Sequence, residues 1–364
     1  MWRRITEDGV SATFGLAADE FMADRQGGVA TLRLYTYASH CVLLGRHQNL
    51  ETEVNLVECN LKEVSVCRRP TGGGTILMGA EQLGVALTIP SEKRNDFPES
   101  SRELYPILAG GIIDGLSTFG VNATFHRKND LEVCGRKISG LGIYMAPSGG
   151  LLFHASVLVD LDVFLVLRLL RTPFKKISDR ALDTVVDRIT TLKREATPEM
   201  TVGAAREAVA QGYECRFGVH LSEEPWRTSE LQAIRALEAD KYATEGWVSP
   251  PMCQGSMMVT GRKKTSCGLL EVHLQVEAGR IRQCLITGDF FAQEAQVREL
   301  EKWIRGIPVS NTELSAALNA FWQRQGGLIE GITKDELLSA FGRAARDAER
   351  ESASLSSHAC FVNP

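Results

Sequence analysis

The sequence predicts an α+β fold. Segments with apolar residues every three or four positions alternate with short β-branched runs, and residues 129–159 form strand-like runs joined by tight turns. A second group of strand and helix signals starts at Gly268. With 364 residues, of which 44% are hydrophobic, the chain is long enough for two domains. We expect one domain over residues 1–245 and a smaller one over residues 246–364.

Composition and charge exclude several classes of protein. The net charge of −4 disfavours a nucleic-acid partner. No apolar run approaches the roughly 18 residues of a membrane-spanning helix, and the first residues show no secretory pattern. The nine cysteines are scattered and form no C-x-x-C pair, which is typical of reduced thiols rather than a disulfide frame or zinc site. We therefore expect a cytoplasmic protein without a membrane or nucleic-acid partner.

The first third of the chain predicts two helices and three strands. Apolar side chains recur at helical spacing in residues 11–26, and residues 51–60 predict a shorter helix. Strands are predicted at residues 29–37, 41–44 and 64–67. A polar cluster after the second strand is either a plain turn or part of a site, because sites often form on loops at strand ends: Gly45-Arg46-His47-Gln48-Asn49.

The middle of the chain predicts a strand, a helix and a β-meander. Residues 84–89 predict a strand that pairs with residues 64–67 if the loop between them acts as a hairpin. Residues 101–119 predict a helix, although its two consecutive glycines weaken the pattern. The meander contains a tight hairpin around Cys134-Gly135, which places Lys137 on a strand beside a glycine-rich run. Taken alone, a lysine on a strand usually faces solvent.

The last third predicts a helix, a linker and the second domain. A helix is expected to open at Thr197-Pro198-Glu199, and residues 222–251 have the mixed character of a linker. Residues 269–276 and 280–286 predict two strands of a hairpin. Two later helices carry capping-box pairs, Ser310 with Glu313 and Thr333 with Glu336.

A glycine-rich loop follows the predicted strand at residues 64–67. It reads Arg68-Arg69-Pro70-Thr71-Gly72-Gly73-Gly74-Thr75-Ile76-Leu77. Three glycines leave bare backbone against which a ligand can press, and the amide N–H groups can point at an anion. An adjacent arginine adds a charged donor fork that suits phosphate or carboxylate. The spacing matches neither a Walker loop nor a G-x-G-x-x-G fingerprint.

Taken together, the motifs resemble the lipoate–protein ligases, which are grouped with the biotin protein ligases and the lipoyl/octanoyl transferases. Five motifs occur in the family's order: Gly45–Asn49 with Glu53-Val54-Asn55, Arg68–Gly74, Asn129-Asp130-Leu131, Gly135-Arg136-Lys137-Ile138-Ser139-Gly140, and Phe153-His154-Ala155-Ser156 before Leu158–Asp162. Residues 271–281 also resemble the accessory domain of the two-domain ligases. The resemblance implies a mainly antiparallel sheet flanked by helices, followed by a small α+β domain.

The chemistry that the resemblance implies has two half-reactions. Lipoate and ATP, with Mg²⁺, give lipoyl-AMP and pyrophosphate, and the anhydride then acylates a lysine of a lipoyl carrier. Lys137 is the expected catalytic cation, in contact with the acyl carbonyl oxygen and the α-phosphate. Asp130 is the expected Mg²⁺ ligand. The implied nucleotide-binding residues are Arg69, Gly72, Gly73, Gly74, Thr75, Ile76, Leu77, Asn129, Asp130 and Lys137, and the implied lipoate-binding residues are Arg69, Gly74, Lys137, Ser139, Gly140 and His154.

The implied partner is a lipoyl carrier protein or domain. Candidates are the acyltransferase subunit of a dehydrogenase complex, the H protein of glycine cleavage, or a specialised lipoate-binding protein. The chain departs from the family where Met78-Gly79 replaces the common His-Asp after the glycine loop. We interpret this departure as a sign of a specialised member that serves a particular carrier.

Two alternatives remain open at the level of sequence. A transferase of the same superfamily moves octanoyl or lipoyl groups through a cysteine thioester without ATP, and Cys134 is the cysteine nearest to Lys137 in sequence. A non-catalytic relative would keep only a lipoyl-binding pocket. The presence of Lys137 with the full glycine loop favours an enzyme, and the accessory domain favours the ligase.

Overall fold

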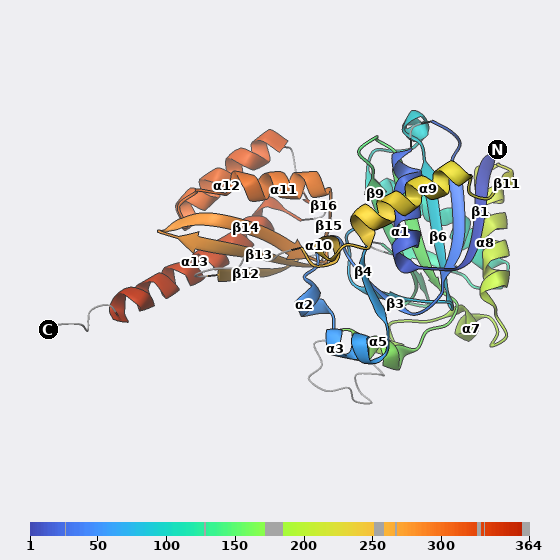
Figure 1. Ribbon diagram of the computed structural model, residues 1–364, viewed down its shortest axis with the longest axis horizontal. Helices are drawn as coiled ribbons and strands as arrows, with labels where there is room; N and C mark the ends of the chain where they lie inside the picture. Colours follow the sequence, from blue (N-terminus) through green and yellow to red (C-terminus); the bar gives the residue numbers. More distant parts are fainter. Residues whose placement is uncertain are drawn as a thin grey trace. The chain divides into compact units, whose positions relative to one another are not determined.

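The computed structural model describes residues 1–25, 27–126, 129–171, 185–250, 258–265, 268–325, 329–330 and 332–358 (Figure 1). The chain divides into two compact units. The first comprises Met1–Leu44, Leu50–Thr71 and Thr75–Val248, and the second comprises Gly45–Asn49, Gly72–Gly74 and Ser249–Pro364. Two short segments that interrupt the first unit in sequence therefore belong to the second unit by their contacts.

The first unit is built on an eight-stranded sheet with the order β11-β1-β2-β6-β10-β9-β8-β7. The pairs β11–β1 and β1–β2 are parallel, and the remaining pairs are antiparallel. The predicted mixed, mainly antiparallel sheet is thus confirmed. The strands are β1 (Trp2–Val10), β2 (Thr31–Tyr37), β6 (Gln82–Ile89), β7 (Thr124–His126), β8 (Asp130–Val133), β9 (Arg136–Met145), β10 (Leu151–Leu158) and β11 (Leu221–Glu223).

Some helices of the first unit cover the two faces of this sheet, and those at residues 50–61 and 163–169 pack beside a smaller sheet. One face packs on α4 and α8, and the other packs on α1 with α9 beside it. The helical elements are α1 (Ala12–Asp24), α2 (Leu50–Glu53), α3 (Leu56–Leu61), η1 (Ser91–Asp96), α4 (Ser101–Ser117), α5 (Val163–Leu169), α7 (Leu192–Glu195), α8 (Val202–Phe217), α9 (Thr228–Leu237), η2 (Glu238–Tyr242) and α10 (Glu245–Val248). The predicted helix at residues 11–26 is confirmed as α1, with Ser11 as its N-cap.

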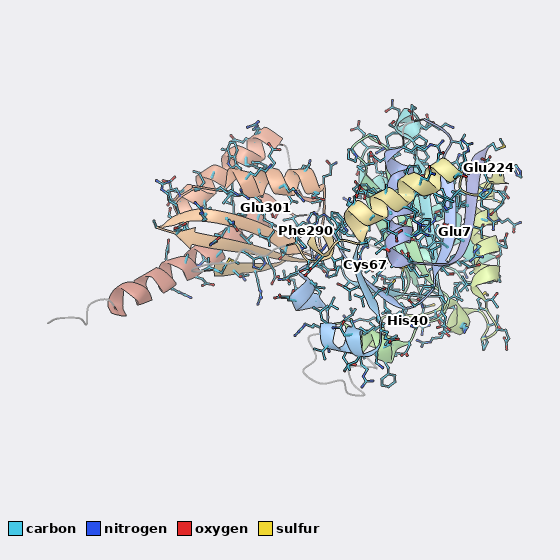
Figure 2. The ribbon with its side chains drawn as sticks, viewed as in Figure 1. Glu7, His40, Cys67, Glu224, Phe290 and Glu301 are labelled. Carbon is cyan, nitrogen blue, oxygen red and sulfur yellow. The ribbon has the colours of Figure 1, made fainter. Side chains whose placement is uncertain are left out.

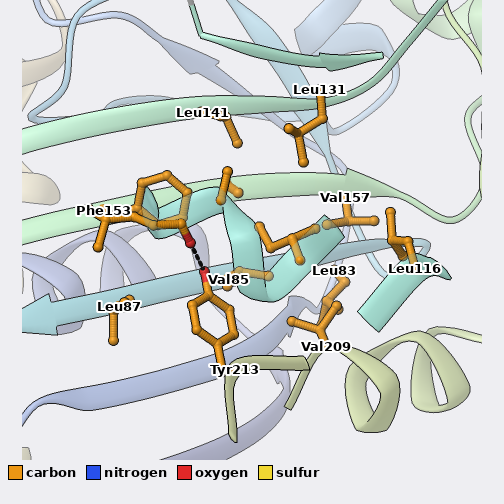
Figure 3. Close-up of a cluster of buried hydrophobic side chains, with 14 of the residues drawn as sticks. Leu83, Val85, Leu87, Leu116, Leu131, Leu141, Phe153, Val157, Val209 and Tyr213 are labelled. Carbon is orange, nitrogen blue, oxygen red and sulfur yellow. Dashed lines mark hydrogen bonds between the residues drawn. The ribbon is translucent and has the colours of Figure 1, made fainter. Parts of the chain in front are cut away.

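Glycines in α4 allow close contact with α8. A Cβ at Gly111 would overlap the Tyr213 ring, and one at Gly115 would overlap the Ala208 carbonyl. The Tyr213 hydroxyl also donates a hydrogen bond to the Leu108 carbonyl at 2.8 Å within the apolar core (Figure 3). The glycines that weaken the helical pattern in sequence therefore serve helix–helix packing. Helix α8 begins at Val202 rather than at the expected Thr197.

The prediction of a linker at residues 222–251 is wrong for residues 222–248, which pack within the first unit, and residue 251 lies outside the described residues. Ile234 of α9 and Tyr242 of η2 are buried in the apolar cluster that contains α1. A buried ion pair between Arg3 and Glu230, at 2.8 Å, ties α9 to the first strand. The buried apolar residues of this stretch are few and lie among charged residues. Its sequence therefore looks like that of a solvent-exposed linker.

A small separate sheet has the order β4-β3-β5 and consists of β3 (Cys41–Leu44), β4 (Ser65–Arg68) and β5 (Ile76–Met78). Strand β4 is parallel to β3, and β5 is antiparallel to β3. The expected hairpin between residues 64–67 and 84–89 is wrong, because β5 intervenes and β6 pairs with β2 and β10 instead. Met78 ends β5 with its side chain buried in the apolar core.

The second unit pairs a three-stranded antiparallel sheet, β12-β13-β14, with three helices. The predicted hairpin is confirmed as β13 and β14. Both capping pairs also form: the Ser310 hydroxyl accepts from the Glu313 amide, and Thr333 and Glu336 cap each other. The elements are β12 (Met258–Thr265), β13 (Gly268–Glu277), β14 (Arg280–Gly288), β15 (Phe291–Ala292), α11 (Glu294–Trp303), α12 (Asn311–Gln325), β16 (Ile329–Glu330) and α13 (Lys334–His358). Among the described residues of the whole chain, no helix has the length and apolar character to cross a membrane.

Candidate active site

A β-bulge in β9 directs Lys137. The β8–β9 hairpin turns at Cys134 and Gly135, whose φ angles of 49° and 77° fit the predicted tight turn. Leu131 pairs with Ser139, but the next residue of β8 pairs with Lys137, so Ile138 is the extra residue. Because a bulge shifts the alternation of side chains by one position, Lys137 and Ser139 lie on opposite faces of the sheet although they are two residues apart.

The side chain of Lys137 identifies one face of β9 and β10 as the face of the candidate site. A Cβ at Gly140 would lie 3.0 Å from the Lys137 Nζ atom, so the lysine extends over Gly140. Gly140 pairs with Ser156 of β10, and Gly142 pairs with His154. We call the face of β9 and β10 that carries these residues the site face. Ser139 lies on the other face, fully buried opposite Val157.

Lys137 combines a fixed backbone with an accessible ammonium group. Its amide donates to the Arg188 carbonyl at 2.8 Å, and its carbonyl accepts from the Thr190 amide at 2.8 Å. Its Nζ atom lies 2.7 Å from Asp130 Oδ1, and the two side chains are 31% and 29% exposed. The predicted catalytic lysine and the predicted metal ligand are thus in direct contact. The Asn129 side-chain amide donates to the Leu141 carbonyl at 2.8 Å and so braces β9.

A second cluster joins the start of the glycine loop to β10. The Arg69 Nε–H donates to Thr71 Oγ1 at 3.1 Å, and that oxygen lies 2.8 Å from His154 Nε2. Burial, together with the positive charge of Arg69, lowers the pKa of His154 to about 3, so its imidazole is neutral at pH 7. Burial, together with Arg68, lowers the pKa of Arg69 to about 10, which leaves the guanidinium charged at pH 7.

Arg68 and Arg69 are neighbours with different roles. Arg68 is buried, and its guanidinium donates to the carbonyls of Trp247 and Val248 at 2.8–3.1 Å. The Trp247 indole N–H donates back to the Arg68 carbonyl at 2.7 Å. Arg68 therefore holds α10 against β4, whereas Arg69 contacts the cluster that contains His154.

The glycine loop belongs partly to the second unit. The Gly73 amide donates to the Phe290 carbonyl at 3.2 Å, and a Cβ at Gly72 would overlap that carbonyl (Phe290 is labelled in Figure 2). A Cβ at Gly74 would meet nothing within 4 Å. Of the remaining predicted nucleotide-binding residues, Thr75 is half-buried, and Ile76 and Leu77 lie in β5, where the Leu77 side chain is in the core.

The polar cluster at residues 45–49 supports this part of the second unit. Arg46 forms an ion pair with Glu294 at 2.6 Å. His47 Nε2 lies 3.2 Å from the Ala292 carbonyl, and its ring stacks on Phe290 with centroids 4.8 Å apart. Arg46 and His47 of this cluster therefore make structural contacts within the second unit, and a part in the site stays a prediction.

Thr71 and Ser156 were missed as site residues by sequence reasoning. Both lie inside quoted motifs, but no role followed from the motifs for either. Strand alternation was the available signal for Ser156, because it lies two positions after His154 on the same strand and so shares its face. No sequence signal places Thr71 against His154, which is far along the chain.

The mixed sheet and the lysine–carboxylate pair on it fit an enzyme of the lipoate ligase and lipoyl transferase class. The chain belongs to the lipoyl protein ligase A/B family: the description "Lipoyl protein ligase A/B catalytic domain" matches residues 11–214. A second description, "Bacterial lipoate protein ligase C-terminus", matches residues 256–341.

Individual relatives carry different names. Octanoyltransferase LipM of Brevibacillus brevis is 26% identical over 272 residues, which cover 68% of this chain and 98% of that protein. A Mycoplasma pneumoniae protein named "Probable lipoate-protein ligase A" is 24% identical over 287 residues, covering 77% and 80%. The crystal structure of P. falciparum LipL1 in complex with lipoate has a TM-score of 0.68 at 17% identity and covers 90% of this chain and 98% of that one. The last likeness establishes the fold.

Proposed function

We propose that this chain is an ATP-dependent lipoate–protein ligase. The observation that carries the proposal is the second unit, most of which matches the C-terminal domain of bacterial lipoate protein ligases. The octanoyltransferase of B. brevis aligns over almost its whole length with only 68% of this chain. A substantial part of the chain therefore has no counterpart in that transferase.

The first half-reaction brings two anions together. A lipoate carboxylate oxygen attacks the α-phosphorus of ATP, the bond to the β-phosphate oxygen breaks, and pyrophosphate leaves. Lys137 is suited to offset the repulsion, because its ammonium is fixed on a strand and reachable from solvent. A positioned donor at such a developing charge contributes about 3 kcal/mol to transition-state stabilisation.

Asp130 is suited to supply one carboxylate ligand of Mg²⁺. The ion usually keeps several waters and binds one or two carboxylates together with substrate phosphates. Within the described part of the chain, no three His, Cys, Asp or Glu side chains are grouped to enclose a metal. Asp130 would therefore hold the ion with the nucleotide, and the ion would supply positive charge at the phosphates. The contact between Asp130 and Lys137 keeps both groups at one point on the site face.

The second half-reaction transfers the acyl group to a carrier lysine. The amine attacks the acyl carbon of lipoyl-AMP, the bond to the phosphate oxygen breaks, and AMP leaves as the amine loses a proton. His154 would contact the acyl end, and the nucleotide would lie along Arg69 and the loop from Gly72 to Leu77. Because the imidazole of His154 is neutral, it adds no positive charge to the site face that carries Lys137.

The test is lipoate-dependent exchange between ATP and pyrophosphate. Wild-type protein should catalyse it, and Lys137→Ala should reduce it about 100- to 1,000-fold. Lys193→Ala is a matched control, because Lys193 forms an ion pair with Asp160 at 2.8 Å with side chains 34% and 37% exposed. No exchange by the wild type, or an equal loss in both variants, would contradict the proposal.

ATP-independent octanoyl transfer is the second candidate, favoured by the names of several relatives. It needs a nucleophilic thiol, and burial raises the pKa of Cys41 well above its usual value and that of Cys67 to about 11. Among the described cysteines Cys134 and Cys215 are exposed, and Cys134 is the candidate because it lies at the turn before Lys137. If Cys134→Ser keeps full activity and no acyl thioester is found by mass spectrometry, this route is eliminated for Cys134.

We propose a lipoyl carrier domain as the protein partner, with a preference for one carrier. Met78, at the departure from the family pattern, is buried, so it would act on partner choice through packing rather than contact. Acylation rates on several purified carrier domains should differ at least severalfold. Equal rates on all of them would remove the proposed preference.

A further inference from the structure

A hydrogen-bonded chain runs from Arg69 through Thr71 to His154. Thr71 is 1% exposed, and its hydroxyl oxygen lies 3.1 Å from Arg69 Nε and 2.8 Å from His154 Nε2. Arg69 is held in place by a further bond from its Nη1 to the Leu43 carbonyl at 2.7 Å. All four residues belong to the first unit.

The direction of this chain follows from counting protons. A guanidinium can only donate, so Thr71 Oγ1 accepts from Arg69. The hydroxyl has one proton of its own, and a buried hydroxyl proton without an acceptor costs about 1–3 kcal/mol. Among the described residues, His154 Nε2 is the acceptor that Thr71 reaches. The hydroxyl therefore donates to Nε2, and the proton of the neutral imidazole must lie on Nδ1.

Gly142 fixes the ring in the position that this bond requires. It pairs with His154 across β9 and β10. A Cβ at Gly142 would overlap the His154 Nε2 atom and would lie 3.2 Å from Thr71 Oγ1. The ring therefore occupies the space of the missing side chain, and Nε2 is directed at Thr71 while Nδ1 remains on the other side of the ring.

We propose that Thr71 is a positioning residue that holds His154 as the Nδ1–H tautomer, so that Nδ1–H donates to a carboxyl or carbonyl oxygen of the acyl substrate. The identity of that substrate as a lipoate-like acid rests on the proposed function. The tautomer assignment rests only on the contacts of Arg69, Thr71, His154 and Gly142. Histidine free in water favours the Nε2–H form, so the hydroxyl of Thr71 selects the less common tautomer.

The first readout is the tautomer itself in the ligand-free protein. Two-bond proton–nitrogen NMR correlations of ¹⁵N-labelled protein distinguish the two forms, and His154→Gln identifies the signal by its loss. Wild type and Thr71→Ser should both show Nδ1–H, because serine keeps the hydroxyl. Thr71→Val, which keeps the side-chain shape, should show Nε2–H or a mixture. An Nε2–H signal in the wild type, or unchanged Nδ1–H in Thr71→Val, would overturn the proposal.

The second readout separates positioning from folding. In lipoate-dependent exchange, Thr71→Val should raise the KM for lipoate about tenfold, corresponding to the loss of about one hydrogen bond, and leave the KM for ATP unchanged. Thr71→Ser should restore the wild-type value. Equal rises in both KM values would overturn the positioning role. Absence of exchange in the wild type would instead contradict the proposed function, while the NMR result would still decide the tautomer.

Discussion

The two faces of β9 and β10 differ in the side chains that they carry beside Lys137. One face packs on α4 and α8 through large apolar side chains such as Phe153, Val157 and Leu141 (Figure 3). The site face carries Gly140, Gly142, His154 and Ser156, and further along the same strands Leu152 and Tyr144 join the apolar cluster around α1. Alternation along a strand lets neighbouring residues serve stability and chemistry separately. The polar groups of the site therefore occupy only part of one face, and the largely apolar face opposite supplies much of the packing beneath them.

The largest effect should come from the packed face. Phe153 is fully buried, so Phe153→Ala should reduce the free energy of unfolding by about 3–5 kcal/mol through lost burial and a cavity. Urea unfolding followed by circular dichroism measures this. The adjacent change on the site face, His154→Gln, is the control and should cost much less at pH 7. A decrease in the free energy of unfolding of less than about 1 kcal/mol for Phe153→Ala would contradict this difference between the two faces.

Lowering the pH should destabilise the protein through His154 on the site face. Its pKa is about 3 in the folded protein and about 6.5 when unfolded, so between these values the unfolded state binds one more proton. Stability should therefore fall as pH falls through this window, by up to about 1.4 kcal/mol per pH unit from this group. Urea unfolding at pH 6, 5 and 4 should show a smaller slope in His154→Gln. An identical slope would show that His154 is not held neutral.

Gly140→Ala should separate activity from stability. The new Cβ would lie 3.0 Å from Lys137 Nζ, and the flexible lysine can move by a few tenths of an ångström. Stability should stay within about 1 kcal/mol of the wild type, while lipoate-dependent exchange should fall about three- to tenfold. Full activity in this variant would mean that the lysine position over Gly140 is not the active one.

The smallest effect is expected at Ser139, on the packed face. Its hydroxyl is buried, and the described residues offer it no hydrogen-bond partner. Ser139→Ala removes an unsatisfied polar group at little cost in packing, so it should stabilise the protein by up to about 1 kcal/mol. Thermal unfolding would detect the change. A destabilised Ser139→Ala protein would show that the hydroxyl has a partner after all.

Local signals predicted much of the fold. Cys134-Gly135 marked the hairpin because the turn requires two left-handed residues, and the capping pairs marked α12 and α13. The pairing of strands that lie far apart in the chain was harder to predict from the sequence. Nothing near residues 64–67 specifies a parallel partner, so the insertion of β5 and the pairing of β6 elsewhere could not be foreseen.

The candidate site was predictable in its residue types but not in its orientations. Lys137, Asp130 and His154 were expected, and the structure brings Lys137 and Asp130 together. Ser139 was expected among the lipoate-binding residues with Lys137, but the bulge at Ile138 places the two on opposite faces. A bulge depends on the partner strand, so one strand's sequence does not reveal it. Whether these residues bind lipoate and ATP stays a prediction.

The bonds from Arg68 to Trp247 and Val248 also determine where the first unit can be cut. A fragment ending at residue 245 would delete two carbonyl acceptors of this arginine, which is buried in the intact protein. A protease that cleaves after residue 248 would leave the hydrogen bonds from Arg68 to Trp247 and Val248 intact. The smallest stable piece of the first unit therefore extends through Val248, and its C-terminal limit is set by an arginine that lies 180 residues earlier.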